Sequence, residues 1–258
     1  MGTRFELAIV MDEAQQSEAQ LRAIGELALR EIDDWHQRLT RFEADSWLSH
    51  VNRTAADEAV PLDDEMCALF ADAIAVWRDS DGAFDIARGH GAALELNPGT
   101  QTLRFRHDRV SLDLGAIGKG HALDCAAQCL RQHGVTRALV QGGTSSGIVM
   151  GAPPDGRSWR IGLSSASLTG DIAEVIDLAD SSFSVSDDGS QVQAPGGRHI
   201  VDHRPTGDVC RRHASRRAVV TGPSARLTDA WSTALVVLGE VPPAFPSGYA
   251  ARFIGKER

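Results

Sequence analysis

No stretch of this 258-residue sequence stays apolar for long enough to cross a membrane. The longest hydrophobic runs are short, such as "ALVV" at 234–237, whereas a transmembrane helix needs about 20 apolar residues. The opening "MGTRFELAIV" lacks a basic leader, a long apolar core and a cleavage site, so we expect no signal peptide in this chain. Repeats and low-complexity linkers are absent too. We therefore predict a single domain, residues 1–258, without a membrane span.

Basic charge is scarce as well. Lys and Arg together number 26 against 35 Asp and Glu, which gives a net charge of -9. Because the phosphate backbone of nucleic acid calls for a basic face, we expect no nucleic-acid partner. An acidic protein also repels anions at long range, so any phosphate site must be locally positive or carry a metal.

Cysteine is rare, and none of the four requires an oxidising compartment. The composition, 42% hydrophobic and 24% charged, allows a globular core without disulfides. Cys125 and Cys129 are four residues apart, the spacing at which two side chains share a helix face. Because no Cys-x-x-Cys or His-x-x-x-His pattern accompanies them, we interpret them as small buried residues rather than as a metal pair.

Hydrophobic periodicity predicts helices early in the chain and strands late. Four helices are expected: 15–39, 63–78, a long one that follows the glycines of residues 115–120, and a last one from Thr228 that ends at Gly239. Residues 41–52 are expected to be irregular and partly helical. The expected strands are short: 4–10, 110–114, 138–141, 147–150, 159–163, 173–178, 183–186, 199–201, 218–221 and 252–254. This order favours an α+β fold with a largely antiparallel sheet.

The stretch "SLDLGAIGKGHALDCAAQCLRQHG", residues 111–134, is the first candidate site. Three glycines surround one lysine at the start of a helix: Gly115, Gly118 and Gly120, with Lys119. The segment is neither a Walker P-loop, since Asp113 stands at the first glycine position, nor a Gly-x-Gly-x-x-Gly fingerprint. The N–H groups of a helix N-terminus and the lysine charge together indicate an anion site. The alternative is a glycine-rich turn whose Lys119 points into water.

A second candidate is "ALVQGGTSSG", residues 138–147, where an apolar strand runs into two glycines and three hydroxyls. Gly142 and Gly143 would let a flat ligand or a phosphate approach the backbone, and Thr144 and Ser145 could hydrogen-bond it. The alternative is a simple hairpin turn between two strands.

A third candidate is "TDAWSTALVVLG", residues 228–239. Asp229 and Thr233 are four apart and share a helix face, and a carboxylate with a hydroxyl is a hard-oxygen pair that suits Mg²⁺. The alternative is that Thr228 caps the helix and Asp229 complements its dipole.

A fourth candidate is "HIVDHRPTG", residues 199–207, a dense cluster of titratable groups. His199 could transfer a proton near neutral pH, with Asp202, His203 and Arg204 beside it. The alternative is a surface turn with scattered charges.

Taken together and in this order, these segments resemble the ApbE family, the FAD:protein FMN transferases, over almost the whole chain. The resemblance is carried by "MGT" (1–3), "LTRFEADSWLSHVN" (39–52), "GAFD" (82–85), "DLGAIGKGHALD" (113–124), "GGTSS" (142–146), "HIVDHRPTG" (199–207) and "TDAWSTALVVLG" (228–239). It implies an α+β, ApbE/T-fold-like architecture with packed helices. It also implies an enzyme that uses FAD and a divalent metal, usually Mg²⁺, to move FMN onto a Thr or Ser hydroxyl of a target flavoprotein, with release of AMP.

The resemblance also implies roles for single residues. Asp229, Thr233 and a backbone carbonyl near Ala116 would hold the metal. Lys119 would lie by the pyrophosphate, and His199 would transfer the proton. The flavin and cofactor site would include Gly142, Gly143, Thr144 and Asp202.

The sequence also departs from the family pattern. It has "GGT" where many members have Gly-Gly-Asp, and His121 where they have Tyr. Residues 84–113 are short for the family. Two alternatives stay open: an FAD-binding protein without transfer activity, and an FAD pyrophosphatase that uses water in place of a protein hydroxyl. Family members often work in the periplasm or at a membrane, and the sequence fixes neither the compartment nor the acceptor.

Overall fold

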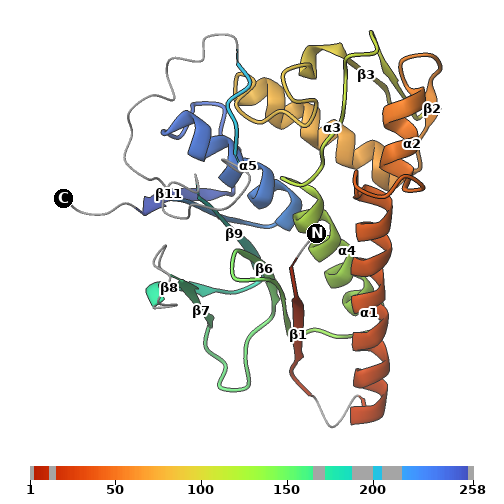
Figure 1. Ribbon diagram of the computed structural model, residues 1–258. Coiled ribbons are helices and arrows are strands. Elements are labelled where there is room, and N and C mark those ends of the chain that lie inside the picture. Colours follow the sequence, from red (N-terminus) through yellow and green to blue (C-terminus); the bar gives the residue numbers. More distant parts are fainter. Residues whose placement is uncertain (1–2, 12–15, 165–171, 188–199, 205–216, 255–258) are drawn as a thin grey trace.

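The centre of the molecule is a six-stranded sheet in which all neighbouring strands are antiparallel (Figure 1). The computed structural model describes residues 3–11, 16–164, 172–187, 200–204 and 217–254. In sheet order, the strands are β1 (Phe5–Ile9), β5 (Ala138–Gly142), β6 (Ser146–Met150), β9 (Ser181–Asp187), β10 (Arg217–Gly222) and β11 (Ala250–Ile254). The predicted α+β class with a largely antiparallel sheet is confirmed.

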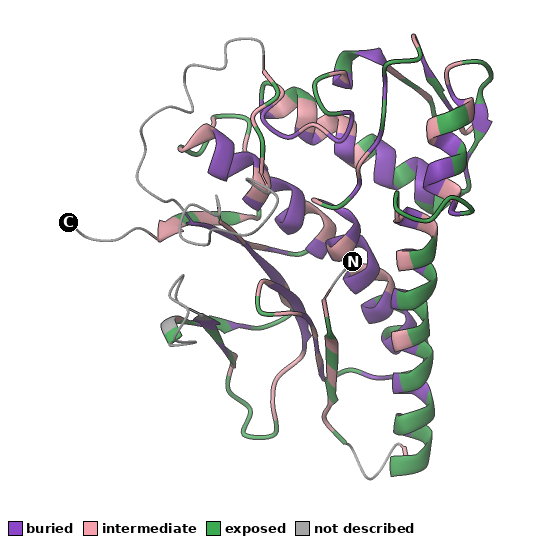
Figure 2. Ribbon diagram, in the orientation of Figure 1, coloured by how far each residue is buried: buried purple, intermediate pink, exposed green. Residues whose placement is uncertain are grey.

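Three helices cover one face of this sheet: α1 (Glu18–Leu39), α4 (Gly118–Gln132) and α5 (Ala225–Leu238). The hairpin of β7 (Trp159–Ser164) and β8 (Ile172–Leu178) packs on the other face through a separate apolar cluster. Figure 2 shows that α4 and α5 are buried along most of their length, whereas α1 exposes its outer side. The two N-terminal ends of α4 and α5 therefore lie in the interior, where a charged group needs a partner.

A smaller unit stands beside the helices (Figure 1). It contains α2 (Trp47–Thr54), α3 (Asp64–Asp79), a 3₁₀ turn (Gly91–Ala93) and a three-stranded sheet ordered β2 (Val60–Pro61), β4 (Thr102–Phe105) and β3 (Leu94–Asn97). The sequence did not predict this small sheet. Its strands are only two to four residues long, too short to show a clear period.

The helix ends follow from capping side chains. Ser17 caps α1 in a capping box with Gln20, and Asp63 caps α3 by accepting the N–H of Met66 at 2.8 Å. The predicted apolar face of the first helix is buried: Leu21, Ile24, Ala28, Ile32, Trp35 and Leu39. Gly239 ends α5 with φ 73°, as predicted. The cap of α5 is Ser224, not Thr228, so the helix begins one turn earlier than expected.

The expected strands at 110–114 and 199–201 are wrong as far as they are described. Val110, Leu112 and Leu114 are buried in alternation, but the segment pairs with no strand. Instead, the side-chain amide of Asn52 bonds both backbone groups of Leu112, at 2.7 and 3.1 Å. Residues 200–201 are not in a strand either, and residue 199 lies outside the described part of the chain.

Candidate functional site

The glycine-rich turn leads directly into α4. Asp113 shapes it, because its Oδ1 accepts the N–H of Gly115 at 3.0 Å while its Oδ2 lies 2.8 Å from Nε of Arg41. Ala116 stands partly buried in the middle of the turn, and Lys119 follows in the first turn of the helix. The carbonyl expected to bind metal and the lysine expected to bind phosphate thus come from one helix N-terminus.

Helix packing explains two of the three glycines. A Cβ on Gly120 would lie 2.1 Å from the carbonyl oxygen of Ala225, at the start of α5, which no side chain can tolerate. A Cβ on Gly118 would lie 3.2 Å from the end of the Leu39 side chain. The backbone that approaches Gly120 therefore belongs to the protein itself, whereas Gly118 faces only a leucine side chain. As a result, the N-terminal ends of α4 and α5 touch.

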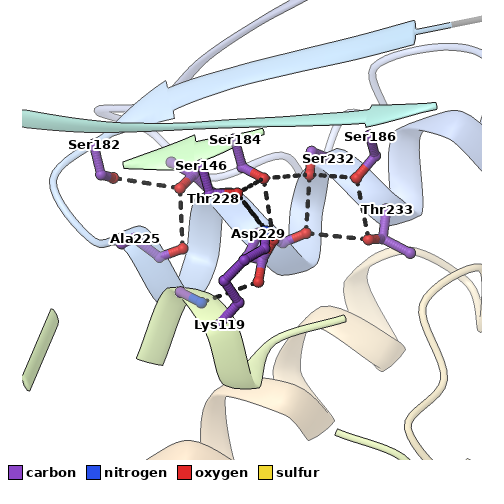
Figure 3. Close-up of polar contacts among 11 residues, drawn as sticks. Lys119, Ser146, Ser182, Ser184, Ser186, Ala225, Thr228, Asp229, Ser232 and Thr233 are labelled. Atoms are coloured by element: carbon purple, nitrogen blue, oxygen red, sulfur yellow. Dashed lines mark hydrogen bonds and ion pairs between the residues drawn. The ribbon is translucent and has the colours of Figure 1, made fainter. Parts of the chain in front are cut away.

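This contact brings Lys119 onto Asp229 (Figure 3). The lysine Nζ lies 2.7 Å from Oδ1 of Asp229, whose side chain is 5% exposed. The same carboxylate accepts the N–H of Gly120 at 3.0 Å and the hydroxyl of Ser184 at 3.1 Å. Lys119 therefore does not point into water. A buried ion pair with every oxygen bonded is the arrangement that offsets the cost of taking two charges out of water.

A row of hydroxyls continues from this carboxylate along the interface of β9 and α5 (Figure 3). The hydroxyl of Ser232 donates to that of Ser184 at 3.1 Å. The hydroxyl oxygen of Ser186 lies 2.8 Å from that of Ser232 and 3.4 Å from that of Thr233. Sequence reasoning missed these serines. The signal was present in the strand "SSFSVSD", where every second residue is a serine on the face toward α5: Ser182, Ser184 and Ser186.

The expected metal ligands supply suitable chemistry. Asp229 and Thr233 lie one turn apart on α5, and the hydroxyl of Thr233 donates to the backbone carbonyl of Asp229 at 3.2 Å, which leaves its oxygen able to accept or to bind a cation. The carboxylate, the hydroxyl and the carbonyl expected near Ala116 are all hard oxygen donors, the kind of ligand that Mg²⁺ prefers. Lys119 now holds one carboxylate oxygen, so a cation bound there must displace or share with its ammonium.

The hairpin of β5 and β6 lies beside Lys119. A Cβ on Gly142 would lie 2.8 Å from the ring of Phe5 and 3.4 Å from Cδ of Lys119. Gly143 has φ +62° and its N–H donates to the carbonyl of Arg4, just before strand β1, while Thr144 is exposed at the tip. The segment is a hairpin turn, as one interpretation held, and it places Gly142, one of the predicted flavin-binding residues, next to the lysine.

The pair of Asp202 and Arg204 fixes a further segment near the small unit. The guanidinium contacts both carboxylate oxygens at 2.9 Å. This hydrogen bond holds the pKa of Asp202 below its usual range, although burial acts to raise it. The segment lies against the "GAFD" loop, since Cβ atoms on Gly82 and Gly89 would lie 3.5 Å from Arg204 and 3.6 Å from His203.

Asp85 organises the loop that meets this segment. Its carboxylate accepts three backbone N–H groups, those of Ala87, Gly89 and Gly91, at 2.7, 2.9 and 3.1 Å. The structure therefore brings two predicted motifs together, "GAFD" and "DHR". His199, the expected proton-transfer residue, lies outside the described residues.

The fold is shared with solved flavin transferases. The chain is similar to the flavin transferase ApbE from Vibrio cholerae, with a TM-score of 0.79 and 20% identity over 100% of this chain and 91% of that one. It is also similar to the apo flavinyl transferase ApbE of Pseudomonas stutzeri, with a TM-score of 0.77 and 23% identity over 98% and 88% of the two chains. These likenesses establish the fold.

The sequence comparison establishes the family. The profile described as "ApbE family" matches residues 1–94 and 89–244. The FAD:protein FMN transferase of Salmonella typhimurium is 24% identical over 277 residues, 93% of this chain and 77% of that protein. The enzyme of the same name in Escherichia coli K12 is also 24% identical, over 93% and 76% of the two chains. The chain belongs to the ApbE family. Within the described residues, no helix is both long and apolar enough to cross a bilayer.

Proposed function

We propose that this protein is an FAD:protein FMN transferase. A Thr or Ser hydroxyl oxygen of an acceptor flavoprotein forms a bond to the FMN phosphorus of FAD. The bond from that phosphorus to the bridging oxygen breaks, AMP leaves, and the hydroxyl proton passes to a base. The observation that carries the proposal is the meeting of Lys119 with Asp229 at the N-terminus of α4, beside the 142–144 hairpin. Membership of the family supports the same reaction.

In this proposal Asp229, Thr233 and the carbonyl near Ala116 hold Mg²⁺. When bound, the ion would neutralise charge on the non-bridging phosphate oxygens and would help AMP to leave. Asp229 is suited to the role because it is 4% exposed and already tied down by Gly120 and Ser184, so it needs little reordering.

Lys119 binds the pyrophosphate in this proposal. Displaced from Asp229, its ammonium at the N-terminal end of α4 would make a locally positive site within an acidic protein. Only two residues of the chain are lysines, Lys119 and Lys256, although Lys and Arg together number 26. The compact ammonium of Lys119 donates to both Ser146 and Asp229.

The remaining roles rest on the resemblance and on proximity. Gly142, Gly143 and Thr144 line the flavin site in this proposal, and the position of Gly142 beside Lys119 supports it. Asp202 belongs to the cofactor site and is held rigid by Arg204. His199 accepts the proton of the incoming hydroxyl.

The reaction can be tested on the purified chain with FAD, MgCl₂ and a Thr-containing acceptor peptide. We expect AMP release together with flavin that stays on the peptide in a denaturing gel, and loss of both in Asp229→Asn. AMP release with no flavin on the peptide would indicate a pyrophosphatase. FAD binding without AMP release would indicate a carrier. Either result would overturn the transferase proposal.

A further inference from the structure

Three metal-ligating side chains converge between α3 and α4, in a cluster that shares no residue with the Asp229 site. His121 and Cys125 lie four residues apart on α4, and Glu65 comes from the first turn of α3. One ligand atom from each lies within 4.8 Å of the others. The sequence interpretation looked only for Cys–Cys and His–His pairs, and so missed the His-x-x-x-Cys spacing at this position.

The distance between the two α4 donors fits a tetrahedral ion. Sγ of Cys125 lies 3.8 Å from Nε2 of His121. Bond lengths of about 2.3 Å for Zn–S and about 2.0–2.1 Å for Zn–N put two donors of a tetrahedral site about 3.6 Å apart. A Cys, His and carboxylate set is also the donor chemistry of zinc rather than of magnesium.

The charge around the cluster permits a cation. The two nearest guanidinium groups each have a carboxylate of their own: Arg38 lies 2.6 Å from Asp63, and Arg226 lies 2.6 Å from Asp72. The carboxylate of Glu65 is then left to balance a cation at the cluster. Glu65 is exposed, so an ion can reach the cluster from its side.

The protonation state of the histidine suits binding, whereas the thiol of Cys125 must lose its proton to the metal. Burial, with help from Arg226 and Arg38, lowers the pKa of His121 to about 3, so its imidazole is neutral at pH 7, the form that binds metal. Burial raises the pKa of Cys125 to about 12, with Glu65, Asp124 and Glu31 adding to the rise. Without a metal the sulfur is therefore a thiol.

We propose that Glu65, His121 and Cys125 form a second cation site, for a thiophilic divalent ion of the Zn²⁺ type, with water as the fourth ligand. Binding forms a metal–sulfur bond and releases the thiol proton to solvent. With Nε2 bound to the metal, the ring hydrogen of His121 lies on Nδ1, which can no longer accept a hydrogen bond from Arg226. The guanidinium, whose Nη1 lies 3.5 Å from Nδ1 without metal, then turns toward its partner Asp72. The ion ties α3 to the helix that carries Lys119.

The test uses the full chain with saturating Mg²⁺, titrated with Co²⁺ and then with Zn²⁺ as competitor. We expect one equivalent of Co²⁺ with a thiolate-to-cobalt charge-transfer band, and release of that band by Zn²⁺. Since outer-shell partners alone are worth about 10–100-fold in metal affinity, loss of the ligand in Glu65→Gln should weaken binding at least about tenfold. Cys125→Ser should abolish the band.

The matched control is Cys129→Ser. Sγ of Cys129 lies 4.0 Å from Nδ1 of His133, the residue that caps the C-terminus of α4, so the four-residue Cys–His spacing is repeated, but no third donor of the described residues joins them. This variant and Asp229→Asn should keep the band. Zn²⁺ should also raise the melting temperature of the unaltered chain, which checks the proposal even if Cys125→Ser fails to fold. Absence of the band, its survival in Cys125→Ser, or its loss in Cys129→Ser would overturn the proposal.

Discussion

Nζ of Lys119 lies 2.7 Å from Oδ1 of Asp229, although the two residues are 110 positions apart in the sequence. One is the expected phosphate ligand and the other the expected metal ligand. In the described structure each neutralises the other, and the carboxylate is nearly inaccessible to water. The pair is thus both a structural contact between α4 and α5 and the contact that a bound metal would have to change.

Removing the lysine charge should destabilise the protein in the absence of metal. Lys119→Met leaves Asp229 buried and unpaired, which typically costs about 3–5 kcal/mol. We expect Mg²⁺ to restore more of the melting temperature in this variant than it adds to the unaltered chain, measured by thermal denaturation with and without MgCl₂. The control is Arg106→Ala, which breaks an exposed pair with Glu95 and should cost less than about 1 kcal/mol. Equal losses in both variants would contradict the prediction.

The two glycines at the start of α4 should tolerate alanine differently. Gly120→Ala would drive a methyl group into the backbone of Ala225, and overpacking of this kind costs about 1–3 kcal/mol. Gly118→Ala meets only the flexible end of Leu39 and should change the unfolding free energy little. Urea denaturation of both variants measures the difference. If Gly118→Ala is the more harmful, helix packing is not the reason for these glycines.

Acid should destabilise the protein through His121. Its pKa is about 3 when folded and about 6.5 when unfolded, so between these values the unfolded chain binds more protons. The free energy of unfolding therefore rises with pH across this window, by up to about 1.4 kcal/mol per pH unit. The contribution of His121 to stability is complete above about pH 6.5 and decreases as the pH falls below that value. Denaturant unfolding at pH 4, 5, 6 and 7 checks this. His121→Phe cannot take up the proton and should show a shallower slope, whereas an unchanged slope would assign the acid sensitivity to other groups.

Alanine variants of two nearby histidines, His199 and His203, should differ in activity if His199 is the proton acceptor. His199→Ala should lose about 10²–10⁴-fold of the transfer rate while still binding FAD, because the proposed metal and phosphate ligands are unchanged. His203 is exposed beside the "GAFD" loop, so His203→Ala should keep most activity. Steady-state transfer to a Thr-containing peptide, with FAD binding by calorimetry, tests both. Full activity in the first variant with loss in the second would assign the proton transfer to His203.

Periodicity in the sequence was enough to find the main elements. The helices at 15–39 and 63–78 were predicted within a few residues, because a helix that buries one face must repeat apolar residues with its own period. The same reasoning failed at 110–114. Alternating burial there reflects packing of Leu112 and its neighbours into the core, while Asn52 takes the place of a pairing strand. Alternating apolar residues indicate that one face of a segment is buried, but they do not indicate that the segment pairs with another strand.

What the sequence determined at the site was the set of groups: a lysine among glycines, a carboxylate with a hydroxyl one turn later, and two glycines after a strand. Only the tertiary structure decided which of these groups are in contact. Gly120 is required by a carbonyl of Ala225, and Ser184 reaches Asp229 because β9 and α5 pack face to face. The convergence of Glu65 with His121 and Cys125 depends on how the first turn of α3 approaches α4. Contacts between distant segments are set by the packing of whole helices and strands, so the spacing of residues within one segment cannot predict them.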